Sequence, residues 1–284
     1  MTKAYRVLKL DDNVKLAAKS TVEPISKESD AEIIERMRER FDILEDMTRA
    51  VKKGEVRAMI VSGAPGVGKS FGVEKVLAPH AMLSTIADDT KLKKFEIVKG
   101  AMSAIGLYKK LYEYSDKKCI LVFDDCDSVL LDDIALNILK AALDTSKKRT
   151  ISWNTDSRSL IAEGVPNSFE YKGGAIFITN INFANIKSKK LQDHLAALES
   201  RCHYIDLTIH TERDKMLRIK QIVGDGMLKD YEFTAEQEAE LVEFVDANKK
   251  RLRELSLRTV LKAADLIKSF PSKWQRVAEV SLMR

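Results

Sequence analysis

The chain has 284 residues, of which 45% are hydrophobic, and a formal net charge of +5. This length and composition predict a folded protein with one large core and a second, smaller one. The sequence has no run of about eighteen apolar residues, which excludes a membrane-crossing helix, and residues 1–6 lack the features of a secretory signal. With three cysteines and no C-x-x-C pair, we expect a cytoplasmic protein with reduced thiols, no zinc site and no membrane partner.

The first part of the chain predicts an arm followed by a helix. Residues 1–28 show no sustained periodicity, and we expect them to form an N-terminal arm. Ser29 and Glu32 then make an S-x-x-E capping box, which predicts an amphipathic helix that extends to about residue 52.

Residues 63–70 match the phosphate-binding pattern G-x-x-x-x-G-K-S/T at every fixed position. They lie between a predicted strand, 58–62, and a predicted helix, 69–77, so backbone N–H groups and a helix N-terminus can cradle phosphates. We expect Lys69 to reach the β- and γ-phosphates of ATP and Ser70 to bind Mg²⁺. The residues assigned to the nucleotide in this segment are Gly63, Ala64, Pro65, Gly66, Val67, Gly68, Lys69, Ser70 and Phe71.

Further short apolar runs predict buried strands at 95–98, 119–123 and 175–179, and stretches with helical spacing predict helices at 101–114 and 131–143. This alternation predicts an α/β fold with an open, mostly parallel five-stranded sheet flanked by helices. Two short strand-like pieces, 150–153 and 168–171, predict a hairpin at about 150–172.

Asp124 and Asp125 directly follow the apolar run 119–123. Ligands of open α/β sheets bind at the carboxyl ends of the strands, so these carboxylates are expected in the same crevice as Lys69. We assign Asp124 to Mg²⁺ and Asp125 to the general base that polarises the attacking water. Asp127 is the alternative base.

Beyond Ile209 the pattern changes to helices, predicted at 211–222, 234–245 and 256–268. We therefore expect an α/β nucleotide-binding domain at 29–209 and a small helical lid domain at 210–284.

From about residue 40 onward, the phosphate loop, the acidic pair and this order of domains resemble the AAA+ ATPases. The resemblance implies ATP hydrolysis in a homo-oligomeric ring, with a hexamer as the expected size. The family usually has Asp-Glu in its acidic motif, whereas this chain has Asp124-Asp125, and the shorter carboxylate reaches about one C–C bond less far.

The resemblance also implies roles for three further residues. Asn180, at the end of the run 175–179, would be the sensor 1 residue that orients the water. Arg201, in a Ser-Arg-Cys sequence, would be an arginine finger for the nucleotide of a neighbouring subunit. Arg258, in the first turn of the helix opened by Ser256, would be the sensor 2 residue, held by the γ-phosphate.

The compact module with a small lid resembles AAA+ ATPases encoded by tailed bacteriophages, which would place the chain in a host cytoplasm. The hairpin is similar to the pre-sensor-1 hairpin of superfamily 3 helicases, which points into a central pore. Side chains suited to a DNA strand occur on or next to it: Lys147, Lys148, Arg149, Trp153 and Arg158. For Trp153, simple packing is the alternative.

Residues 101–110 occupy the position of a pore loop, where Met102, Ile105 and Lys109 would grip a polymer; packing of an ordinary helix is the alternative. Basic clusters at 91–94, 147–149, 187–190 and 249–253 would bind nucleic acid if several share one face, and are solvated surface otherwise. DNA is the expected substrate, for a helicase, a helicase loader or a translocase. The alternatives are an ATP-driven remodeller of a partner protein complex and a regulatory switch ATPase.

Overall fold

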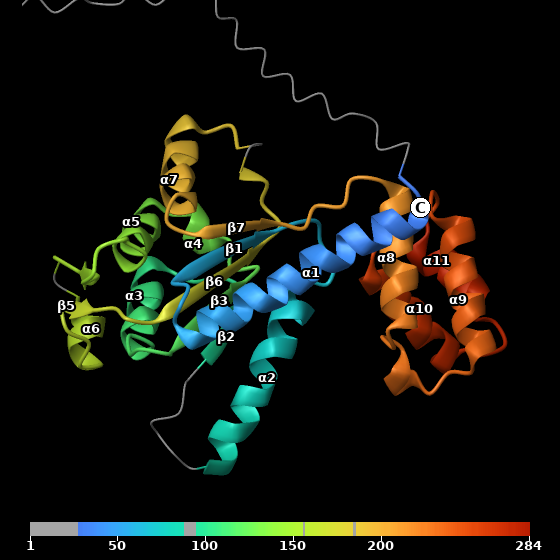
Figure 1. Ribbon diagram of the computed structural model, residues 1–284, viewed down its shortest axis with the longest axis horizontal. Coiled ribbons are helices and arrows are strands. Elements are labelled where there is room, and N and C mark those ends of the chain that lie inside the picture. Colours follow the sequence, from blue (N-terminus) through green and yellow to red (C-terminus); the bar gives the residue numbers. More distant parts are fainter. Residues whose placement is uncertain (1–27, 88–94, 156, 184–185) are drawn as a thin grey trace, which may run out of the picture.

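The computed structural model describes residues 28–87, 95–155, 157–183 and 186–284 (Figure 1). Of the predicted arm at 1–28, only Glu28 falls within these ranges, and the basic cluster 91–94 lies outside them. The predicted mixed α/β fold, with a five-stranded parallel sheet flanked by helices, is confirmed.

The main sheet consists of five parallel strands in the order β2–β3–β6–β1–β7. Their bounds are β1 Ala58–Ser62, β2 Phe95–Lys99, β3 Ile120–Asp124, β6 Gly174–Thr179 and β7 His203–Asp206. Strands β1, β3 and β6 are buried along their whole length, which is why the sequence shows them as continuous apolar runs. Strand β7 forms an edge of the sheet and is mostly exposed, and no apolar run marks it.

Helices cover both faces of this sheet (Figure 1). One face carries α1 Asp30–Lys53 and α2 Lys69–Ala87, and the other carries α3 Ala104–Glu113, α5 Asp133–Ala142 and α7 Lys189–Glu199, with a short helix α4 Ser128–Leu131 before α5. The capping box of Ser29 and Glu32 opens α1, as predicted. The chain can leave the end of α1 because Gly54 adopts a left-handed conformation with φ 78°.

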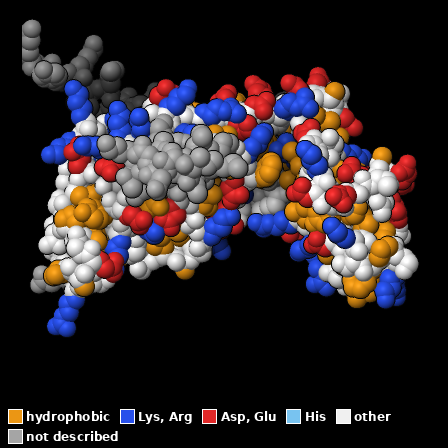
Figure 2. All heavy atoms as spheres, turned by 90° about the horizontal axis from the view of Figure 1, so that it is seen from below, with side chains coloured by type: hydrophobic (Ala, Val, Ile, Leu, Met, Phe, Trp, Pro, Cys, Tyr) orange, Lys and Arg blue, Asp and Glu red, His pale blue; other side chains and the backbone are white. Residues whose placement is uncertain are grey.

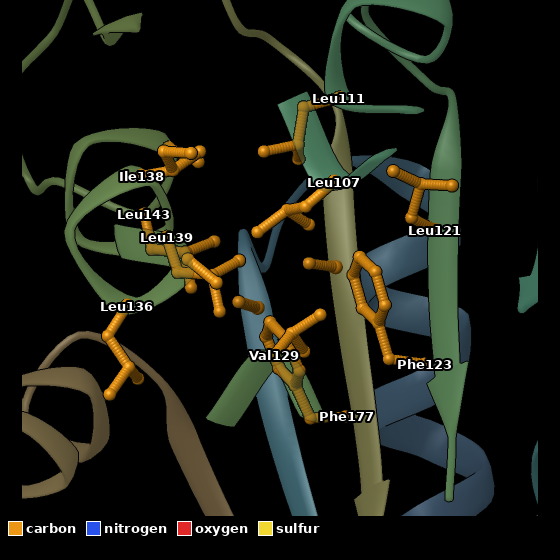
Figure 3. Close-up of a cluster of buried hydrophobic side chains, with 14 of the residues drawn as sticks. Leu107, Leu111, Leu121, Phe123, Val129, Leu136, Ile138, Leu139, Leu143 and Phe177 are labelled. Atoms are coloured by element: carbon orange, nitrogen blue, oxygen red, sulfur yellow. The ribbon is translucent and has the colours of Figure 1, made fainter. Parts of the chain in front are cut away.

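Side chains that alternate along β3 enter two different hydrophobic clusters. Leu121 and Phe123 join the cluster under α3 and α5, where Phe123 stacks on Phe177 of β6 with ring centroids 5.0 Å apart (Figure 3). Ile120 and Val122 join the opposite cluster under α1 and α2. Each such fully buried side chain contributes about 1.5–3 kcal/mol, so the two clusters hold the sheet, and with it the loops at its carboxyl end, in place.

The predicted hairpin is present as a separate antiparallel pair, β4 Thr150–Ser152 and β5 Ser168–Glu170. A short helix that the sequence did not indicate, α6 Arg158–Ala162, lies between the two strands. Lys109 of α3 pairs with Glu163 directly after α6, and this contact fastens the hairpin to the main body.

The C-terminal part is helical and has a hydrophobic cluster of its own. Its elements are α8 Glu212–Gly224, the 3-10 turn η2 Lys229–Tyr231, α9 Ala235–Asn248, α10 Leu257–Ser269 and α11 Trp274–Leu282. The sequence predicted α8, α9 and α10 within a few residues but not α11, which Trp274 anchors against Phe244 of α9 with ring centroids 4.8 Å apart. Helix α1 runs from the sheet to α8, so it contacts both parts of the molecule (Figure 1). No helix among the described residues is long and apolar enough to cross a membrane.

Candidate functional site

The phosphate loop connects the end of β1 to the start of α2, as predicted. Gly66 and Gly68 have φ values of 70° and 102°, a conformation that side-chain-bearing residues rarely adopt. Gly66 also has no room for a side chain, because an added Cβ would lie 2.7 Å from Cβ of Ser256. The two glycines therefore fix both the shape of the loop and its contact with the helical part.

Lys69 is the first residue of α2, and its ammonium group lies at the centre of the site. Its Nζ donates to the carbonyl oxygens of Gly63 at 2.8 Å and Ala64 at 2.9 Å and to Oδ1 of Asn180 at 2.8 Å. Burial, opposed by the attraction of Asp125 and assisted by the positive charge of Arg258, lowers the pKa of Lys69 to about 8. An anion bound next to Lys69 would therefore stabilise the protonated form of this ammonium group.

Asn180 connects Lys69 to Asp125. Its amide Nδ2 donates to Oδ1 of Asp125 at 2.7 Å, while its Oδ1 accepts from Lys69. Asp125 has φ 52°, a strained value for a residue with a side chain, and its N–H donates to the carbonyl of Ile178 at 3.0 Å. This backbone contact between β3 and β6 directs the Asp125 carboxylate toward Asn180.

Asp127, the alternative base, is engaged elsewhere. Its Oδ1 accepts a hydrogen bond from the Thr179 hydroxyl at 2.6 Å, and burial raises the pKa of its carboxyl group. The geometry therefore favours Asp125 over Asp127 as the carboxylate that faces Lys69 and Asn180.

Ser70 and Asp124 form the oxygen-rich corner of the site. The Ser70 hydroxyl donates to Oδ1 of the buried Asp124 at 2.9 Å. A hydroxyl and a carboxylate beside a phosphate cradle are the hard oxygen ligands that suit Mg²⁺, which usually retains waters and takes one or two carboxylates together with substrate phosphates. Within the ranges that the structure covers, no three His, Cys, Asp or Glu side chains form a protein-only metal cage. The donor set thus fits a Mg²⁺ ion that binds together with a nucleotide.

Lys99, the last residue of β2, belongs to the site although no sequence motif indicated it. Its Nζ lies 3.2 Å from Oδ2 of Asp124 and 3.0 Å from Oε1 of Glu74. The signal that could have revealed it is its position, because a residue that ends a strand next to β3 lies at the same edge of the sheet as Asp124.

The helical part meets the phosphate loop at the N-terminus of α10. The N–H of Leu257 donates to the carbonyl of Gly66 at 3.0 Å, and the buried Ser256 hydroxyl beside that glycine has no hydrogen-bond partner among the described residues. Arg258 follows in the first turn with an exposed side chain, and its charge acts on Lys69. Arg258 is therefore near enough to Lys69 for the two charges to interact. Phe71, the residue after Ser70, is 68% exposed.

Arg201 lies far from this site, at the opposite end of the sheet. It follows α7 and precedes β7, whose first residue, His203, pairs with Met59 near the start of β1. The phosphate loop follows the end of β1. The Arg201 guanidinium donates to the carbonyl of Ala197 in the preceding helix α7. In a single chain Arg201 and Lys69 are not brought together.

The structure corrects the expectation that Arg149 contacts DNA. Its side chain is buried, and it donates to the carbonyl oxygens of Ala142 at 2.9 Å and Gly173 at 3.1 Å. Its guanidinium also lies over the ring of Tyr171, with Cζ 5.1 Å from the centroid. Arg149 thus fastens the base of the hairpin, while the neighbouring Lys147 and Lys148 are exposed.

The other predicted polymer contacts are also largely internal. Trp153 is half-buried against Tyr108, with ring centroids 5.6 Å apart, so packing explains it. Met102 and Ile105 pack against the core, and Lys109 pairs with Glu163, which argues against a gripping role for these three side chains. On the face shown in Figure 2, Lys and Arg side chains are interspersed with Asp and Glu over both lobes.

Comparison with curated proteins finds a bacteriophage relative. The uncharacterized 36.7 kDa protein in the nrdC–mobD intergenic region of Enterobacteria phage T4 is 34% identical over 255 residues, which cover 89% of this chain and 76% of the phage protein. The chain belongs to the family of this phage protein. No family model matches the chain.

The similarity of the chain to solved structures is low. Domain III of the Thermotoga maritima replication initiation protein DnaA has 11% identity and a TM-score of 0.48, with 86% of this chain and 92% of that chain covered. A replication initiator DnaA bound to AMPPCP and single-stranded DNA has 13% identity and a TM-score of 0.44, with 82% of this chain and 62% of that chain covered. At TM-scores this low, neither likeness carries an argument about function.

Proposed function

We propose that the chain is a Mg²⁺-dependent ATPase of the AAA+ type. The observation that carries the proposal is the hydrogen-bonded series from Lys69 through Asn180 to Asp125. It joins an ammonium group, an amide and a carboxylate at the carboxyl ends of parallel strands, which supports roles for them as phosphate-binding cation, water-orienting group and base. The contact between Ser70 and Asp124 at the same edge supplies oxygen ligands for a metal ion.

Each of these groups has a role in the hydrolysis of ATP. Lys69 exchanges the loop carbonyls for the β- and γ-phosphates, and the loop N–H groups hold the phosphate oxygens. Asp125 accepts a proton from a water that Asn180 orients. The water oxygen bonds to the γ-phosphorus as the bond to the β–γ bridging oxygen breaks, and ADP leaves with inorganic phosphate.

Mg²⁺, held by Ser70 and Asp124, would neutralise charge on the phosphate oxygens. The same two side chains orient each other through their hydrogen bond, so the metal ligands are prepared before a nucleotide arrives.

We further propose that the ATPase works as a homo-oligomeric ring, in which Arg201 of one chain serves the nucleotide of the next. The position of Arg201 supports this, because it lies at the end of the sheet opposite to its own phosphate loop. A guanidinium delivered from a neighbour would stabilise the charge that develops on the transferred phosphoryl group. Arg258 of the helical part would contact the γ-phosphate from within the same chain.

We propose that the polymer on which the ring acts is DNA. The exposed Lys147 and Lys148 at the base of the hairpin and Arg158 in α6 support this role. They lie on a hairpin that Arg149 and Lys109 fasten to the main body, so a force on the hairpin would be transmitted to the sheet.

The test is the rate of ATP hydrolysis with no polymer, with single-stranded DNA, with duplex DNA and with an unfolded polypeptide. Lys69→Ala protein, purified in the same way, controls for contaminating ATPases. We expect hydrolysis that needs Lys69 and rises with DNA. Stimulation by polypeptide alone would instead identify a protein remodeller, and a rate that no polymer changes would identify a regulatory switch ATPase.

A further inference from the structure

A second arginine of the helical part, Arg218 of α8, lies buried beside the phosphate loop. Its side chain is 6% exposed, and its Nη2 is 3.9 Å from the point where a Cβ on Gly68 would stand. Its guanidinium lies over the ring of Phe41 in α1, with Cζ 3.6 Å from the ring centroid. Arg218 is therefore located where the helical part, α1 and the phosphate loop meet.

This guanidinium is poorly paired. Among the described residues no carboxylate lies within ion-pair distance of it, although the negative charges of Asp225 and Asp42 act on it. Its Nη1 donates to Oε1 of Gln221 at 2.9 Å, and its buried Nε has no hydrogen-bond partner within the described part of the chain. Burial lowers the pKa of Arg218 to about 10, against the opposing attraction of Asp225 and Asp42, so the side chain is still charged at neutral pH.

A buried cation that no carboxylate contacts lowers the stability of a folded protein, because the desolvation of its charge is only partly offset. The Phe41 ring offsets part of this loss through its cation–π contact. The rest of the desolvation cost of the Arg218 charge would be offset by an anion bound beside it. The neighbouring phosphate loop has the sequence of an anion-binding loop.

The two arginines of the helical part lie at different points along this loop. The charge of Arg258 acts on Lys69, whose ammonium is expected at the β- and γ-phosphates. Arg218 lies beside Gly68, whose backbone belongs to the part of the loop that cradles the α- and β-phosphates. The two cations thus address two different parts of a nucleoside triphosphate.

We propose that Arg218 binds the phosphate portion that ATP and ADP share, and thereby holds the helical part onto the loop in both nucleotide states. This inference rests on the proposed nucleotide binding. It gives Arg218 a role separate from that of Arg258, which would respond to the γ-phosphate and so distinguish ATP from ADP.

The experiment compares Arg218→Met with Lys220→Met by calorimetric titration of ATP and of ADP, together with thermal melting without nucleotide. Lys220 lies on the same helix and pairs with Asp246 at the surface, so its variant removes the same charge away from the loop. For Arg218→Met we expect affinity to fall about tenfold or more for ATP and ADP alike. We expect nucleotide-free protein to melt no lower than the wild type, because an unpaired buried charge has been removed. Lys220→Met should leave both affinities unchanged.

Wild-type affinity of Arg218→Met for both nucleotides would overturn the inference, as would a loss confined to ATP. A lower melting temperature with unchanged affinity would show that Arg218 acts only in packing. If Arg218→Met does not fold, Arg218→Lys keeps the charge but loses the planar fork, and it should still weaken ATP and ADP binding equally. Failure of the wild-type protein to bind either nucleotide would instead refute the proposed function.

Discussion

Lys99 and Asp124 are register partners on the neighbouring strands β2 and β3, and the ammonium group of the first lies 3.2 Å from the carboxylate of the second. The carboxylate assigned to Mg²⁺ therefore already faces a cation from the protein itself. Hydrogen bonds to Glu74 and Asp124 raise the pKa of Lys99, so Lys99 is protonated at neutral pH. An incoming divalent cation must compete with Lys99 for Asp124.

Lys99→Met should consequently strengthen Mg²⁺ binding. The Lys99 side chain is 60% exposed, so the expected change is modest, with the Mg²⁺ concentration for half-maximal ATP binding about two- to fivefold lower. A magnesium titration at fixed ATP measures it. Lys75→Met, which removes an exposed lysine paired with Glu45 on the same side of the sheet, is the matched control. An unchanged or higher magnesium requirement in Lys99→Met would show that Lys99 does not compete for this carboxylate.

The depressed pKa of Lys69 predicts proton uptake on nucleotide binding. With a folded-state pKa of about 8, against an ordinary 10.5, the folded protein holds fewer protons than the unfolded chain between these values. The contribution of Lys69 to the free energy of unfolding therefore rises with pH across this window. Phosphates beside Lys69 would raise its pKa again, so ATP binding at pH 8 should take up about half a proton.

Calorimetry of ATP binding in two buffers with different ionisation enthalpies measures this uptake. At pH 8 the apparent binding enthalpy should differ between the buffers, and at pH 6, where Lys69 is already protonated, its contribution should vanish. Equal enthalpies in both buffers at pH 8 would mean that the ammonium group does not meet the phosphates.

The sequence revealed those parts of the site that depend on local pattern. The loop 63–70 is one continuous segment, and buried strands such as β3 are apolar throughout, so Asp124 and Asp125 could be placed by adjacency alone. Strand β7 was not predicted, because an exposed edge strand does not need a continuous apolar sequence.

Residues whose partners come from distant segments could not be interpreted in this way. Arg149 belongs to a basic cluster in the sequence that is typical of a solvated surface. In the structure its side chain is buried and donates hydrogen bonds to the carbonyls of Ala142 and Gly173. Lys99 and Arg218 carry no motif at all. Lys99 lies beside Asp124 because β2 pairs with β3, and Arg218 lies beside the phosphate loop because α8 packs on α1.

Activity should depend on assembly through Arg201. Arg201→Ala protein should bind ATP like the wild type and hydrolyse it poorly, because the missing guanidinium serves the adjacent chain. Mixing it with Lys69→Ala protein should restore part of the activity, since some interfaces then combine an intact loop with an intact arginine. Hydrolysis is measured across mixing ratios, with co-assembly verified by sedimentation. Absence of any restoration in proven mixed assemblies would exclude an arginine finger that acts between chains.

The hairpin should contribute charge to DNA binding through Lys147 and Lys148. Replacing both by Gln should weaken single-stranded DNA binding for all sequences, and should flatten the dependence of log affinity on log salt by about 0.7 for each lysine that neutralises a phosphate in the wild type. Lys262→Gln/Lys273→Gln, which makes the same charge change on exposed residues of the helical part, is the control. Basal ATP hydrolysis should persist in both variants. If the two variants show the same salt slope as the wild type, the hairpin lysines do not bind DNA.

The most direct test of the proposed mechanism is the rate of ATP hydrolysis by Asp125→Asn protein, measured beside Asp127→Asn. An amide at position 125 can keep a hydrogen bond to Asn180 but cannot accept a proton, so ATP binding should persist while the rate falls about 100-fold or more. An amide at position 127 can still accept from Thr179, so that variant should hydrolyse ATP at close to the wild-type rate. Near-normal hydrolysis by Asp125→Asn, with the loss appearing in Asp127→Asn instead, would contradict the assignment of the base and the mechanism built on it.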